Sequence, residues 1–156
     1  MDAEQARARI AVIRSSDGMS PADDLDELWA ALPPVRPEDI LGPWKGYAVA
    51  TGHRVEGMLV EAQWHGKRFT SLSDVDPLIC RDADGQLYSN IALGQGKATL
   101  QTGEFRGEKT AAMVYEGLPV RDFFKRIDED ALLGVMDGPE TLDEGRHFYF
   151  VLERDR

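Results

Sequence analysis

The strongest constraint in this sequence is a long run of short segments rich in β-forming residues, which begins at Lys67 and continues to Arg154. Branched and aromatic side chains favour strands, and the Gly, Pro, Asn and Asp residues between the segments favour turns. Asp84-Gly85, for example, is a strong hairpin signal. The predicted strands are 67–71, 77–82, 86–93, 97–107, 110–116, 120–128, 132–138 and 146–154, with a further strand around Trp44.

Short connections between these segments predict an antiparallel meander. Closing a meander into a barrel removes its exposed edges. We therefore predict a mainly β (α+β) fold, an antiparallel barrel of about 8–9 strands with N-terminal helices packed outside. A chain of 156 residues has the usual size of one domain. We divide it into a helical extension over 1–34, a first half over 35–92 and a second half over 97–155, which share one barrel.

Three helices are predicted from apolar spacing. The first covers 3–14. The second lies within 20–34, with Ser20 as N-cap, Pro21 at the first helical position and Pro33-Pro34 ending it. The third begins near His53. Their apolar stripes are Ala6, Ile10 and Ile13 in the first, Leu25, Leu28, Trp29 and Leu32 in the second, and Val55, Met58, Leu59 and Ala62 in the third.

Alternation along the predicted strands indicates which residues share a face. In the last strand Phe148, Phe150 and Leu152 lie on one side, and His147, Tyr149 and Val151 lie on the other. Both sides are largely apolar, so we expect both to be covered. In the segment 120–128, Asp122 shares a face with Val120 and Phe124, which places a carboxylate among apolar neighbours.

Charge and composition limit the classes of partner. The net charge of −10 disfavours nucleic acid, because phosphate binding relies on clustered Lys and Arg. It also disfavours adsorption to anionic membranes, so we expect membrane contact to be transient at most. A single cysteine, Cys80, provides no internal disulfide framework and fits a cytoplasmic location.

Motifs for metal or nucleophilic chemistry are missing. No HExxH sequence occurs, and no cysteine stands at metal-ligand spacing from a histidine, so we expect neither a metal nor another cofactor. Cys80 lies in an apolar segment, where a buried inert thiol is more common than a nucleophile. No GxSxG sequence is present.

The stretch 41–52 contains Gly42, Trp44 and Gly46 at alternate positions. Glycine within a strand permits tight bending or the close approach of another backbone. The pattern indicates the start of a strand where the large Trp44 ring must lie flat and backbones must come close.

Several strings together resemble one known family. GPWKG at 42–46 matches the motif of the GXWXG family, and WHGKRF with DVDPL resembles its next block. The C-terminal half is similar to the domain of unknown function that accompanies this family, through FRGEKTAAMVYEGLPVRDFF, LLGVMDG and FYFVLERD. The resemblance implies a small β-barrel with phospholipid or another lipid as ligand.

The Gly-x-Trp motif also resembles the strand start of lipocalin-like barrels. In those barrels the Trp ring lies under an Arg from the last strand, and this resemblance implies that Arg154 covers Trp44. A guanidinium over an indole contributes about 0.5–2 kcal/mol. The resemblance thus implies that Gly42, Trp44, Gly46 and Arg154 close one end of the barrel; contact of Trp44 with a ligand is the alternative.

Charged residues inside the barrel are candidates for ligand contact. Lys67 is favoured over Arg68 because it shares a strand face with Phe69; the alternative is a solvated basic pair. Arg106 and Asp122 are candidates for an interior ion pair, with a surface hairpin pair as the alternative. The predicted ligand-binding residues are Trp64, Lys67, Phe69, Arg106, Met113, Tyr115, Asp122, Phe124, Met136 and Phe150. Met58 and Tyr88 are further cavity candidates, and a solid core is the alternative.

Three functions remain open from the sequence. The first is non-catalytic binding of a lipid or another small hydrophobic molecule, including phospholipid or fatty acid. The second is an enzyme that uses acid–base chemistry on a small apolar substrate, with Asp122 as base and Tyr115 or His147 as partner. The third is a scaffold whose acidic surface binds a protein. Homodimer formation is also left open.

Overall fold

The sheet is built from nine strands that follow the predicted meander. A computed structural model describes residues 1–156. The strands are β1 (Gly42–Ala48), β2 (Trp64–Ser71), β3 (Asp74–Arg81), β4 (Leu87–Ser89), β5 (Ala98–Phe105), β6 (Glu108–Tyr115), β7 (Arg121–Asp128), β8 (Ala131–Asp137) and β9 (Tyr149–Arg154). The helices are α1 (Ala3–Ser15), α2 (Ala22–Ala31), the 3₁₀ helix η1 (Pro37–Ile40), α3 (Arg54–Glu61) and α4 (Ile91–Gly94).

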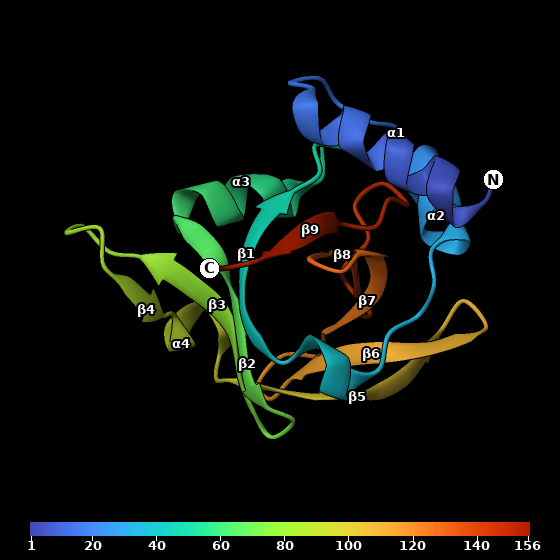
Figure 1. Cartoon of the computed structure of the whole chain (residues 1–156). Helices are drawn as coiled ribbons and strands as arrows, with labels where there is room; N and C mark the ends of the chain where they lie inside the picture. Colours follow the sequence, from blue (N-terminus) through green and yellow to red (C-terminus); the bar gives the residue numbers. More distant parts are fainter.

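Eight antiparallel strands close into a barrel, as predicted (Figure 1). Their order is β2-β1-β9-β8-β7-β6-β5-β3, and pairing of β2 with β3 completes the ring. The ninth strand, β4, pairs only with β3 and lies outside the ring. β1 pairs with β9, and β3 pairs with β5 through Val75 and Ala98, so strands from both ends of the chain contribute to one sheet.

Two apolar cores lie on opposite sides of the sheet. The inner core contains Phe148, Phe150 and Leu152, whereas Tyr149 and Val151 belong to the outer core. The alternation predicted for the last strand is therefore confirmed. The outer core is covered by α1 and α2, which lie together against one side of the barrel (Figure 1). None of the helices is long and apolar enough to cross a membrane.

Two local predictions are wrong. Ser20 does not cap α2, because Pro21 is the N-cap residue and the amide of Ser20 donates a hydrogen bond to the carbonyl of Ala50. The segment 86–93 is not one strand. It ends as a strand at Ser89, and the Asn90 side chain then accepts a hydrogen bond from the amide of Leu93, which caps the short helix α4.

Candidate functional site

The motif Trp closes one end of the barrel. Trp44 is 1% exposed, and its indole N–H donates a 2.8 Å hydrogen bond to the carbonyl oxygen of Ile40. Arg154 lies over the ring, with its guanidinium carbon 4.1 Å from the ring centroid. The same guanidinium donates to the carbonyl of Asp39 at 3.1 Å, which ties β9 to η1. Trp44 thus fills the end of the barrel at which β9 finishes.

The second motif glycine makes room for another tryptophan. A Cβ atom on Gly46 would lie 2.3 Å from the ring of Trp64, which is closer than any real contact. At the neighbouring position of β2, a Cβ atom on Gly66 would lie 1.9 Å from the carbonyl oxygen of Trp44. The two glycines therefore let β1 and β2 approach closely and let the Trp64 ring lie against β1. Trp64 packs edge-on against Phe150, with ring centroids 6.0 Å apart.

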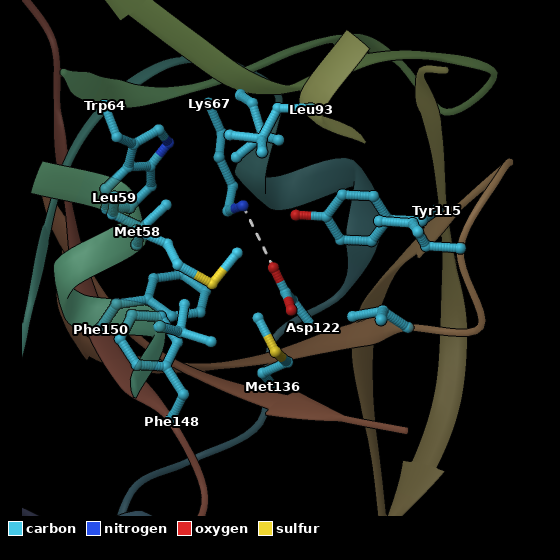
Figure 2. A pocket seen from close by; sticks show the side chains of 14 residues that line it. Met58, Leu59, Trp64, Lys67, Leu93, Tyr115, Asp122, Met136, Phe148 and Phe150 are labelled. Atoms are coloured by element: carbon cyan, nitrogen blue, oxygen red, sulfur yellow. Dashed lines mark ion pairs between the residues drawn. The ribbon is translucent and has the colours of Figure 1, made fainter. Parts of the chain in front are cut away.

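The middle of the barrel is filled and its other end is hollow. Phe124 packs edge-on against Phe69 and Phe150, at centroid distances of 5.7 and 6.0 Å, and these rings occupy the centre. Beyond them is a cavity of about 120 Å³ near the start of β9, under α3 and α4 (Figure 2). Its lining residues are Val55, Met58, Leu59, Trp64, Lys67, Leu78, Leu93, Tyr115, Leu118, Val120, Asp122, Met136, Phe148 and Phe150.

Lys67 and Asp122 form an ion pair in the cavity wall. The Nζ atom of Lys67 lies 3.1 Å from Oδ2 of Asp122, and the two side chains are only 3% and 2% exposed. The ammonium also donates to the carbonyl oxygen of Pro77 at 3.2 Å. Its Nζ lies 5.1 Å from the ring centroid of Phe150 and 5.5 Å from that of Trp64. All other lining residues are hydrophobic or aromatic.

Two polar groups at the cavity are buried without a hydrogen-bond partner. They are the Oδ1 atom of Asp122 and the indole Nε1 of Trp64. Buried polar atoms in proteins are nearly always paired, so each orphan calls for an explanation. The hydroxyl of Tyr115 points toward the ion pair in Figure 2. One donor and one acceptor among the lining residues therefore remain unpaired.

Burial shifts the pKa values of Lys67, Asp122 and Tyr115. Desolvation lowers the pKa of Lys67 although the Asp122 carboxylate opposes this shift, and it raises the pKa of Asp122 although the ammonium opposes it. Desolvation, assisted by the charge of Asp122, also raises the pKa of Tyr115 well above its usual value. The phenol of Tyr115 is therefore protonated at neutral pH and can donate a hydrogen bond.

The structure separates the residues proposed from the sequence into three groups. Those that line the cavity are Trp64, Lys67, Tyr115, Asp122, Met136, Phe150 and Met58. Those buried in the barrel core beside it are Phe69, Met113 and Phe124. Those outside the barrel are Arg106, His147 and Tyr88, the last of which is 43% exposed on β4. Arg68 also points outward and pairs with Asp76 at 2.9 Å.

Arg106 and Asp122 form neither the candidate interior ion pair nor the surface pair that was its alternative. Arg106 occupies the tight turn between β5 and β6, with φ of 52°, and so belongs to neither face of a strand. Its guanidinium bonds to Asp26 of α2 at 3.0 Å and to the hydroxyl of Tyr149 at 2.8 Å. His147 also contacts this guanidinium, so it lies outside the barrel and cannot assist Asp122.

The lining residues that sequence reasoning missed lie in α3, β3, α4, the loop before β7 and the segment just before β9. Val55 and Leu59 belong to the apolar stripe recognised on α3, and Leu93 belongs to α4. The stripe was a usable signal, because the apolar face of an amphipathic helix packs against another apolar surface. The sequence alone does not show at which end of the barrel α3 packs.

The remaining reactive side chains have structural partners. His53 is the N-cap of α3 and its Nε2 lies 2.8 Å from the carbonyl oxygen of Thr141. His65 lies 2.8 Å from the carboxylate of Asp155. Burial raises the pKa of the Cys80 thiol. No group of three or more His, Cys, Asp or Glu side chains is placed to hold a metal ion.

Comparison with known proteins identifies the family. Residues 27–85 match the family described as GXWXG protein, and residues 96–154 match the one described as domain of unknown function (DUF4334). The crystal structure of a protein from Thermomonospora curvata has a TM-score of 0.89 and 36% identity to this chain, covering 97% of this chain and 99% of that one. No curated protein matches the sequence. The chain therefore belongs to the GXWXG family, in its tandem arrangement with the companion domain DUF4334.

Proposed function

We propose that this protein binds a small hydrophobic molecule in the cavity at the α3 end of the barrel. The observation that carries the proposal is an apolar cavity whose wall holds one buried ion pair with an unpaired carboxylate oxygen. Binding sites for small molecules are typically apolar hollows with a few convergent polar groups. The aromatic and aliphatic lining would supply affinity, at about 0.8 kcal/mol per buried CH₂ group.

The size of the cavity narrows the expected class of lipid. Its volume of about 120 Å³ is of the same order as that of an engineered cavity of roughly 150 Å³ that binds benzene. A whole phospholipid or long fatty acid needs more space than this, so it would enter only if α3 or α4 moved away from the barrel. We therefore propose a guest of roughly the size of one aromatic ring, or the end of a longer chain.

Native mass spectrometry of protein taken from cells tests this proposal. We expect an additional mass of a small organic molecule that disappears on denaturation. Val55→Phe, which fills the cavity from α3, should lose this mass. Val60→Phe on the same helix is the matched control, because Val60 is 78% exposed and should leave binding unchanged. Two results together would contradict binding. The protein would show no additional mass, and added small apolar molecules would not raise its melting temperature.

An enzyme that uses Asp122 as a general base is the second candidate. It is favoured by the position of the unpaired Oδ1 atom at the cavity and by the hydroxyl of Tyr115 directed toward the same space (Figure 2). Titration of the Asp122 carboxyl by ¹³C NMR discriminates between the candidates. A pKa near the ordinary value of 3.8 would argue against catalysis, because a base at neutral pH works best with a raised pKa.

The scaffold hypothesis has less support. A barrel whose interior is completely filled would favour it, and this barrel contains a cavity. The acidic net charge of −10 is the one feature that still favours it.

A further inference from the structure

We propose that the molecule bound at this site is neutral and carries a hydroxyl or N–H group that donates a hydrogen bond to Oδ1 of Asp122. The inference rests on the proposed function and specifies its ligand. It excludes the carboxylate of a fatty acid and the phosphate of a phospholipid from the cavity. Short aliphatic alcohols and phenols are the class that fits.

The charge of the cavity wall argues against an anion. Lys67 and Asp122 are the only charged residues that line it, and they lie 3.1 Å apart. Their combined charge is zero whether the proton resides on the amine or on the carboxyl group. An anionic guest would therefore bring an uncompensated charge into an apolar space, which is strongly unfavourable.

No additional cation is available to compensate an anion. The Lys67 ammonium already donates to Asp122 and to the carbonyl oxygen of Pro77, and aromatic rings surround it. Arg106 lies outside the barrel in a turn. The other fully buried lysine, Lys125, donates to the carbonyl oxygen of Trp29 in the outer core and does not line the cavity.

The unpaired carboxylate oxygen of Asp122 indicates which polar group a guest should carry. Asp122 Oδ1 is buried and accepts no hydrogen bond, although its neighbour Oδ2 contacts Lys67. A hydroxyl group can donate to this oxygen and at the same time accept from the phenol of Tyr115, which points to the same region (Figure 2). A pure hydrocarbon would leave the carboxylate oxygen unpaired, which costs free energy. A guest that donates a hydrogen bond to this oxygen removes that cost and should bind more tightly.

Calorimetric titration of the full-length protein at pH 7 with phenol, toluene and benzoate tests the inference. The three probes have one aromatic ring each and differ in their polar group. We expect phenol to bind at least tenfold more tightly than toluene, and benzoate to show no measurable binding. Equal affinity for phenol and toluene, or preference for benzoate, would overturn the inference and leave binding of a small hydrophobic molecule intact. If none of the three probes binds, both the inference and the proposed binding of a small hydrophobic molecule are contradicted.

The variant Asp122→Asn adds a second, independent result. It removes the negative charge and leaves Lys67 uncompensated, so benzoate should now bind and phenol should lose its advantage over toluene. Asp137→Asn is the matched control, because Asp137 pairs with Arg121 on the surface and does not line the cavity. If Asp122→Asn leaves the order of the three probes unchanged while circular dichroism shows a folded protein, the inference is wrong.

Discussion

The buried pair of Lys67 and Asp122 is the least expected feature at the scale of single residues. Both charges lie among apolar side chains, where loss of hydration can exceed the attraction between them. A pair of this kind is weak support for stability, and removing one partner leaves a buried charge without compensation. The presence of the pair at a cavity, with one oxygen unpaired, therefore supports the proposed ligand site.

Single and double substitutions of this pair should have opposite effects on stability. Lys67→Met and Asp122→Leu should each lower the free energy of unfolding by about 3–5 kcal/mol, because each leaves one buried charge. The double variant should be as stable as the wild type or more stable by about 1–4 kcal/mol. Urea denaturation of the four proteins measures these differences. Additive losses in the double variant would show that the two residues do not compensate each other.

The pair also makes stability depend on pH. Because the pKa of Asp122 is raised in the native state, its stabilising contribution is complete below pH 3.8, the ordinary pKa of the unfolded chain. This contribution is lost as the pH rises through the native pKa. Because the pKa of Lys67 is lowered, the native protein releases this proton first, and stability recovers as the pH approaches 10.5. Relative to the double variant Lys67→Met/Asp122→Leu, wild-type stability should therefore fall above about pH 4 and rise again toward about pH 10.

Urea titrations of both proteins across this range provide the measurement. The comparison with the double variant cancels the contributions of the surface carboxylates, whose own shifts also change stability. A constant difference between the two proteins from acid to alkaline pH would contradict the directions of both shifts.

At the scale of secondary structure, two glycines should respond in opposite ways to the same substitution. Gly46→Ala in β1 should lose about 1–3 kcal/mol, because its Cβ atom would collide with the Trp64 ring at 2.3 Å. Gly57→Ala in α3 should gain about 0.5–1 kcal/mol, because nothing lies within 4 Å and alanine favours a helix. Thermal and urea unfolding measure both effects. If the Gly46→Ala protein is as stable as the wild type, the Trp64 ring does not require glycine at position 46.

Elements with a local pattern were predicted well from the sequence. The two faces of β9 follow from strict alternation, and the stripe on α2 follows from helical spacing with Leu25, Leu28 and Trp29 all buried. The same alternation grouped Asp122 with Val120 and Phe124, which lie on the inner side of the barrel with it. In each of these cases the pattern within the segment was enough to show which residues share a face.

Contacts between distant segments could not be predicted in the same way. Lys67 meets Asp122 only because β2 and β7 face each other across a closed barrel, and neither strand pairs with the other. Arg106 matched a family string, but its place in a turn directs it toward α2. α4 has the apolar composition of a strand, and a single cap from Asn90 turns it into a helix.

At the scale of the whole molecule, both halves of the chain are needed to complete the barrel. β1 must pair with β9, and β3 must pair with β5, for the sheet to close. We therefore expect the fragments 1–95 and 96–156 to show no cooperative unfolding alone, because each exposes two sheet edges and half of the inner core. Mixing the fragments should restore a cooperative transition by circular dichroism. A folded single fragment would mean that one half is an independent domain.

Methionine methyl NMR tests the central claim, that the cavity holds a small guest, most directly. Met58 and Met136 line the cavity, Met113 is buried elsewhere in the core, and Met19 is 67% exposed on the surface. Titration of ¹³C-methyl-labelled protein with phenol should shift the Met58 and Met136 signals in a saturable way and leave the Met19 signal unchanged. Signals of Met58 and Met136 that do not move, or that move only as much as Met19, would contradict a ligand site in this barrel.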